Sequence, residues 1–233
     1  MVKLTEADRR RISEAVARAE ERTDAEILCV LSAKSSNYPE TPLAWGALMA
    51  LLGPVILLIA GVEVSIPDLS GLGWSASQVS EAAEVAARSA LIAAVVLQAG
   101  LFGAVALVLA LAPAIRMRLT PARVRHGRVR RRAYDIFLSR NLAATRRRTA
   151  VLIYVSAGEH VAELVADLGV AEKVDPEVWR APMSRLLAGL KAGRAADGFV
   201  EAIKGCSAIL EQCSPSRPED NPNEIPDLLV ELP

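Results

Sequence analysis

Two long runs of apolar residues stand out in the pattern of hydrophobic and polar positions along the chain. Between Glu40 and Glu63 there are 22 consecutive residues without a charge, and between Arg88 and Arg116 there are 27. A helix needs about 20 residues to cross the hydrocarbon core of a bilayer, whereas the alternative, a helix buried in a globular core, seldom lacks a polar face over that length. The pattern therefore predicts a transmembrane hairpin, with spans at residues 43–62 and 90–112 and a loop at 63–89.

Charges beside the spans predict their orientation. Residues 116–148 hold 12 basic side chains and 1 acidic one, whereas residues 41–115 hold 1 basic and 4 acidic. Because lysine and arginine collect on the cytoplasmic side of membrane spans, we expect both termini in the cytoplasm. No small-residue cleavage site precedes the first run, so we expect that run to stay as an anchor in a cell inner membrane.

Shorter patterns on both sides of the apolar runs predict a soluble α/β domain. An apolar stripe behind a Thr5 cap predicts a helix at 6–22, and continuous apolar residues predict buried strands at 25–32 and 149–156. Residues 160–167 fit either a further strand or a short helix. Helices are expected at 175–192 and 195–212. Because one helix and one strand cannot enclose a core, residues 1–40 and 116–233 are expected to fold together, with the hairpin at 41–115 inserted between them.

A basic helix is expected directly after the second span. Thr120 and Pro121 suit its cap and first turn. The side chains expected to point toward the core are Val124, Ala133, Phe137 and Leu138, with the arginines facing outward.

This arginine tract fits lipid headgroups better than nucleic acid. The chain has 27 basic and 27 acidic side chains, which excludes a uniformly basic nucleic-acid binder, and the tract lacks interleaved aromatic residues that stack on bases. Each arginine near an anionic leaflet contributes about 1 kcal/mol of attraction. We therefore expect contact with membrane lipid and no nucleic-acid binding. The residues assigned to headgroup contact are Arg116, Arg118, Arg123, Arg125 and Arg128.

Four short motifs follow one another in the predicted soluble domain. They are Asp24-Ala25-Glu26-Ile27, Arg148-Thr149-Ala150-Val151-Leu152-Ile153, Ala166-Asp167-Leu168-Gly169 and Asn223-Glu224-Ile225-Pro226-Asp227. The ordered set resembles the TPM domain family, which includes a plant thylakoid-lumen acid phosphatase and a cyanobacterial photosystem II repair protein. The resemblance implies a three-layer α/β/α sandwich around a small mixed sheet, interrupted in this chain by the two-helix transmembrane hairpin.

The polar residues of these motifs are the candidates for a metal site. Carboxylate and amide oxygens are the ligands that calcium and magnesium prefer, and the resemblance implies calcium binding or phosphate-ester hydrolysis. Structural roles are the alternative, with Asp167 bonding a backbone N–H in a turn and residues 223–227 tying the chain end to the sheet. The candidate residues are Glu26, Asp167, Asn223, Glu224 and Asp227.

The histidines and cysteines are weaker candidates for a functional site. His126 and His160 are too few for a histidine-based metal site. Cys29, Cys206 and Cys213 are expected as buried thiols, since Cys206 and Cys213 lie about 10 Å apart along one helix, too far for a disulfide.

The sequence favours a noncatalytic role. The favoured hypothesis is a binding or scaffold module that holds an unidentified partner protein at the membrane, with calcium or magnesium as candidate ions. The alternative is a metal-assisted phosphatase acting on phosphate monoesters. Transport is disfavoured because Gln98 is the only strongly polar side chain in the two spans.

Overall fold

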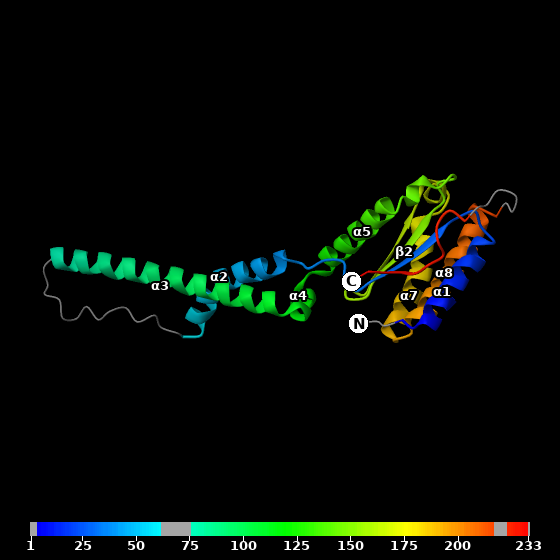
Figure 1. Ribbon diagram of the computed structural model, residues 1–233. Coiled ribbons are helices and arrows are strands. Elements are labelled where there is room, and N and C mark those ends of the chain that lie inside the picture. The colour runs from blue at the N-terminus through cyan, green and yellow to red at the C-terminus, as the bar shows by residue number, and fades with distance from the viewer. Residues whose placement is uncertain (1–3, 62–75, 217–222, 233) are drawn as a thin grey trace. The chain divides into compact units, whose positions relative to one another are not determined.

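The computed structural model describes residues 4–61, 76–216 and 223–232 and divides the chain into two compact units (Figure 1). The α/β unit comprises Met1–Ser36 and Pro121–Pro233, and the hairpin unit comprises Asn37–Thr120. The hairpin unit therefore interrupts the α/β unit in sequence. It lies between the strand Ile27–Ser32 and the helix Ala122–Ser139, both of which belong to the α/β unit.

Helices α2 (Glu40–Ile59), α3 (Ala76–Leu111) and α4 (Pro113–Leu119) form the hairpin unit. The segments Glu40–Ile59 and Glu84–Leu111 are long and apolar enough to cross a membrane, and only 11% and 0% of their most apolar windows are buried. Residues 76–89 were expected in the loop but are helical, because they contain neither glycine nor proline and are rich in alanine. The rest of the expected loop, 63–75, lies outside the described residues.

Small residues let α2 approach α3 closely. A Cβ placed on Gly46 would lie 3.1 Å from the ring and the carbonyl oxygen of Phe102, and Gly53 lies against the side chain of Leu101. The ends of the hairpin are also joined by polar contacts. The hydroxyls of Thr41 and Thr120 lie 2.8 Å apart and are buried. Thr120 was expected to cap the basic helix, but its hydroxyl instead donates to the Arg116 carbonyl at 2.9 Å and contacts Thr41.

A four-stranded mixed sheet lies at the centre of the α/β unit, in the order β3-β2-β1-β4. The central strand β1 is parallel to both β2 and β4, and β3 is antiparallel to β2. Residues 160–167, which fitted a strand or a helix, therefore form a strand because they pair along the whole length of β2. The strand bounds are β1 Ile27–Ser32, β2 Val151–Ser156, β3 Val161–Ala166 and β4 Val230–Leu232.

Helices cover both faces of this sheet, as Figure 1 shows. Ile27, Cys29 and Leu31 pack with α1 (Glu6–Glu20), α7 (Arg180–Lys191) and α8 (Ala195–Cys213). Leu28 and Val30, which point the other way, pack with α5 (Ala122–Ser139). Successive strand residues point to opposite faces, so the alternation confirms the predicted α/β/α sandwich around a small mixed sheet.

The orientation of α5 differs from the expectation in part. Ala133 and Phe137 are buried as expected, but Val124 and Leu138 are 37% and 64% exposed, and Val129 and Ile136 fill the core instead. The helical period explains this, because Val124 and Leu138 lie nine residues before and five residues after Ala133, on the far side of the helix. Apolar positions are too few in this arginine-rich segment to define its buried side.

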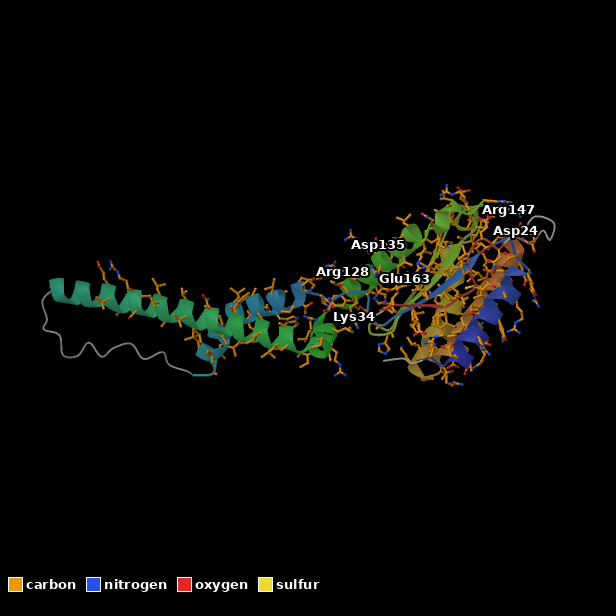
Figure 2. All side chains as sticks on the ribbon, viewed as in Figure 1. Asp24, Lys34, Arg128, Asp135, Arg147 and Glu163 are labelled. Atoms are coloured by element: carbon orange, nitrogen blue, oxygen red, sulfur yellow. The ribbon has the colours of Figure 1, made fainter. Side chains whose placement is uncertain are left out.

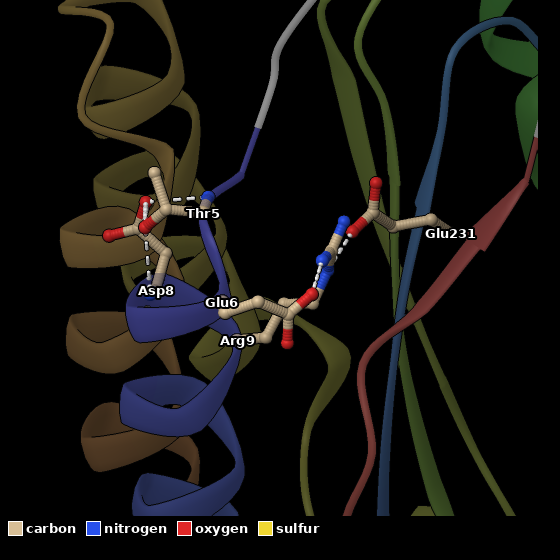
Figure 3. A network of polar contacts seen from close by, with 5 residues as sticks. All are labelled: Thr5, Glu6, Asp8, Arg9 and Glu231. Carbon is tan, nitrogen blue, oxygen red and sulfur yellow. Dashed lines mark hydrogen bonds and ion pairs between the residues drawn. The ribbon is translucent and has the colours of Figure 1, made fainter.

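Polar contacts cap the first helix of the α/β unit and join it to the last strand. The predicted cap is present at α1, where Thr5 and Asp8 form a reciprocal capping box (Figure 3). One turn on, Arg9 contacts Glu6 and donates to Glu231 of β4 at 2.6 Å.

The remaining short helices are η1 Leu142–Ala144, α6 Leu168–Ala171 and η2 Pro176–Trp179, the last capped by Asp175 and leading into α7.

Candidate functional site

The predicted site residues gather at the edge of the sheet where β1 and β2 begin. Glu26 directly precedes β1, and its carbonyl accepts a 2.8 Å hydrogen bond from Val151 at the start of β2. Asp167 directly follows the antiparallel β3, and its N–H donates to Ala150 at 2.9 Å. The 223–227 motif leads into β4 and reaches the same edge, because the Ile225 N–H donates to a Glu26 carboxylate oxygen at 3.0 Å.

Glu26 is the buried member of an acidic cluster. Its residue is only 5% exposed, and burial raises the pKa of the Glu26 carboxyl. The nearby carboxylates of Glu224 and Asp227 also raise this pKa, while hydrogen bonds from the backbone N–H groups of Glu224 and Ile225 lower it. Asn223 donates to Asp227 at 2.6 Å. Four of the five predicted residues therefore lie in one neighbourhood.

Glu20, which the sequence analysis missed, is the most strongly perturbed carboxyl of this cluster. It lies in the last turn of α1 and accepts a 2.7 Å hydrogen bond from the Ile27 N–H. Burial raises the pKa of Glu20 to about 9, with further contributions from Glu26 and Asp227. At neutral pH Glu20 is therefore protonated, and it can donate a hydrogen bond to Asp227.

Asp167 has different partners. One of its oxygens accepts from the Leu168 N–H at 2.7 Å and from Arg148 at 3.3 Å, so it caps α6. The sequence analysis gave such a turn, with Asp167 bonding a backbone N–H, as the structural alternative to a metal site. The turn requires glycine at position 169, because a Cβ there would collide with the Arg147 and Arg148 carbonyl oxygens. The second Asp167 oxygen is buried and has no hydrogen-bond partner among the described residues.

Three consecutive arginines bind three different acids at this edge. The Arg146 N–H donates to Glu224 at 3.2 Å, Arg147 forms an ion pair with Asp24, and Arg148 reaches Asp167. Figure 2 shows Arg147 and Asp24 together at the end of the sheet. These contacts, with the backbone bonds above, give each of these carboxylates a protein partner.

The carboxylates do not converge on one point. Across the ranges that the structure describes, no three His, Cys, Asp or Glu side chains form a group that could hold a metal ion. The contacts at this edge are hydrogen bonds and ion pairs within the protein. Calcium or magnesium binding at Glu26, Asp167, Asn223, Glu224 and Asp227 stays a prediction.

The histidines and cysteines offer no second site in the described chain. His126 and His160 are both exposed, and the Nδ1 atom of each ring contacts a local backbone carbonyl. The three cysteines are free thiols, and Cys29 and Cys206 are buried as expected, whereas Cys213 is only partly buried. Burial raises the pKa of Cys206 to about 12, so it is unreactive at neutral pH.

The predicted headgroup-binding arginines are divided between the two units. Arg116 and Arg118 belong to α4 of the hairpin unit, and Arg123, Arg125 and Arg128 belong to α5. Next to them on α5, Arg130 lies over the Tyr134 ring at 5.8 Å. Figure 2 labels Arg128 on this helix and Glu163 on β3. Burial raises the pKa of Glu163, while the charges of Arg130 and His126 lower it.

Comparison with known proteins shows the fold and no more. No protein-family model matches the chain, and no curated protein matches it. In structure it is similar to the BA42 protein from the psychrophilic bacterium Bizionia argentinensis, solved by NMR, with a TM-score of 0.54 and 17% sequence identity. The similarity covers 98% of this chain and 94% of that one. The chain therefore adopts a known fold.

Proposed function

We propose that this protein is a membrane-anchored binding module, whose α/β unit holds a partner protein at the cytoplasmic face of an inner membrane. The observation that carries the proposal is the exposure of the two apolar helices. Their most apolar windows are 11% and 0% buried, and water solvates such continuous apolar surface poorly. A lipid bilayer would cover this apolar surface and keep it out of contact with water.

Charge supports the cytoplasmic orientation. The arginines of α4 and the start of α5 follow the second span directly, and arginine is retained on the cytoplasmic side. Arg116, Arg118, Arg123, Arg125 and Arg128 would then lie near phosphate headgroups. In this proposal they hold the start of α5 at the lipid surface.

The polar edge of the sheet favours binding over catalysis. Glu26, Asp167 and Glu224 each accept hydrogen bonds from the protein backbone. A carboxylate held in this way orders the loops around it and is less available to a substrate. We propose that the edge stabilises the fold and that the exposed helix surfaces of the α/β unit contact the partner.

A second candidate, a TPM-like phosphatase, is favoured by one observation. The buried Asp167 oxygen without a partner in the described chain is the kind of atom that a metal ion or a substrate proton would satisfy. In this hypothesis calcium or magnesium would bind at the sheet edge and polarise a phosphate monoester.

One experiment separates the two candidates. Hydrolysis of a generic phosphate monoester is measured with the full chain in vesicles, with and without calcium or magnesium, beside Asp167→Asn. The amide that this substitution introduces can still accept from the Leu168 N–H, so the variant is expected to fold, which circular dichroism checks. We expect no turnover above that variant. Metal-dependent turnover that the variant loses would establish the phosphatase instead.

Partner binding is tested in cells by placing a photoreactive residue at exposed Leu138 of α5, with buried Leu186 as the control position. We expect a crosslinked product of one discrete mass from position 138 and none from position 186. Failure to crosslink, in cells that contain normal amounts of the protein, would contradict the binding proposal.

A further inference from the structure

Strand β3 leaves one edge of the sheet open. It is the outermost strand in the order β3-β2-β1-β4, and each of its six residues has a partner on β2. On its other side, no strand of the described chain pairs with it. The strand at the opposite edge, β4, has only three residues. β3 is therefore the longer open edge, and the unpaired backbone groups of such an edge are a template for another strand.

Alternate residues of β3 point their backbone groups away from the sheet. The N–H of Asp167, directly after the strand, donates to the Ala150 carbonyl at 2.9 Å, so Asp167 faces β2. Residues of an antiparallel strand alternate between facing the partner strand and facing away from it. Those at the alternate positions therefore hold their N–H and C=O groups outward, and no other segment of the described chain bonds these groups. These outward residues are Ala162, Leu164 and Ala166.

The open edge carries few of the features that keep edge strands apart. β3 contains no proline or glycine, and it pairs with β2 without a bulge. The side chains of the outward residues are apolar and only partly buried, and they pack against the core on the α7 and α8 side of the sheet. The one charged residue of β3 is Glu163, which lies on the α5 side with Arg130 and His126 as basic neighbours. Backbone groups and apolar surface are therefore available along the same edge.

We propose that β3 pairs antiparallel with β3 of a second copy of this chain, which joins the two sheets into one. The outward residues define the register, because the facing residues that exchange hydrogen bonds must point outward on both strands. In a register centred on Leu164, this residue faces Leu164 of the second copy, and Ala162 faces Ala166. Every outward N–H and C=O group of β3 then has a partner across the two-fold axis.

Charge selects this register over its neighbours. A one-residue shift of the centre toward the start of β3 places Glu163 opposite Glu163 of the second copy. The same shift toward its end places Glu163 opposite Asp167. Like charges directly opposite one another are destabilising. In the proposed register Glu163 faces Val165, so the strand is self-complementary in the one register that uses all of its outward groups.

The symmetry of this pair suits two copies in one membrane. A two-fold axis through Leu164 runs perpendicular to the joined sheet, so α5 of both copies lies on the same side of it. Both arginine-rich helices then face the same bilayer, as two copies inserted with one orientation require. Anchoring in a membrane also raises the effective concentration of one copy around another. The proposed insertion therefore favours the pairing, but the strand contacts themselves do not depend on it.

Amide hydrogen exchange of the full chain in lipid nanodiscs tests the pairing. Discs that hold one copy are compared with discs that hold two, and the exchange of labelled alanine, leucine and valine amides is followed by NMR. We expect the N–H groups of Ala162, Leu164 and Ala166 to exchange at least about tenfold more slowly in two-copy discs. The Val165 N–H, which faces β2, is the control and should exchange alike in both. Equal exchange of the outward amides in the two kinds of disc would overturn the proposal.

A proline variant adds a test of association. Ala162→Pro removes an outward N–H, and edge strands tolerate proline where that N–H faces away from the sheet. Ala162→Ser keeps the N–H and is the matched control. Donor- and acceptor-labelled copies are mixed in phosphatidylcholine vesicles, and we expect energy transfer to be lost in Ala162→Pro and kept in Ala162→Ser. Energy transfer that persists in Ala162→Pro, in protein shown to be folded by circular dichroism, would contradict the pairing.

Insertion is measured separately in the same samples. Recovery of the protein with the vesicles after an alkaline wash reports whether the hairpin is in the membrane. Because the strand contacts do not need the bilayer, slower exchange of the outward amides is also expected when the copies are concentrated in detergent. Protein lost in the wash would contradict insertion, whereas fast exchange of the outward amides at every concentration would contradict the pairing of β3.

Discussion

Glu20 shows how one carboxyl group on an apolar stripe changes the chemistry around it. It follows Ile12 and Val16 at spacings of eight and four residues, so the helix turns it toward the core. There its carboxyl accepts a hydrogen bond from the Ile27 N–H and lies within hydrogen-bonding reach of Asp227. This spacing is visible in the sequence and was the available signal for Glu20. Its acidic partners come from distant segments and became apparent only in the fold.

The raised pKa of Glu20 predicts that stability falls with rising pH. Its pKa is about 9 in the folded chain against an ordinary value of 4.5, so the folded state holds an extra proton between these values. The stabilisation is complete below about pH 4.5 and is lost as the pH rises through 9. We therefore expect a lower melting temperature at about pH 9 than at about pH 6, measured by circular dichroism.

Glu20→Gln is the control for this pH dependence. Its amide oxygen can still accept from the Ile27 N–H, but it does not titrate. The variant should melt at nearly the same temperature at about pH 6 and about pH 9. A variant that keeps the full pH dependence of the wild type would assign that dependence to another group.

At the scale of elements, the helices and strands whose residue pattern lies within one segment were predicted well. Strands β1 and β2 were recognisable from continuous apolar residues, and α8 was predicted to within one residue of its observed end at Cys213. Two features depended on other segments. Whether β3 is a strand was decided by its pairing with β2, and the rotation of α5 was decided by the sheet surface on which it packs.

The close contact of α2 with α3 leads to a prediction about glycine. Gly46→Leu would place a side chain where Phe102 already lies within 3.1 Å of the Cβ position. Such overpacking costs about 1–3 kcal/mol, so we expect lower thermal stability in detergent. Gly103→Leu is the matched control, because no atom lies within 4 Å of its Cβ position. Equal loss of stability in both variants would mean that helix packing at Gly46 is not the cause.

For the whole molecule, the arrangement of the candidate site follows from the order of the strands. Parallel β1 and β2 begin at the same edge, and antiparallel β3 ends there, so Glu26 and Asp167 come to one end of the sheet. The segment before β4 brings Glu224 and Asp227 to Glu26. The sequence alone predicted these residues as a group, but it could not show that Arg146, Arg147 and Arg148 bind the acids there.

The central claim is that the hairpin crosses a membrane with both termini in the cytoplasm. Labelling with a membrane-impermeant maleimide tests it most directly, with Ser70→Cys in the expected outer loop and Glu201→Cys at an exposed position of α8, both in a Cys213→Ser background. In cells with a permeabilised outer membrane and an intact inner one, we expect Ser70→Cys to react at once and Glu201→Cys to react only after detergent is added. Reaction of Glu201→Cys before detergent, or protection of Ser70→Cys, would contradict this account.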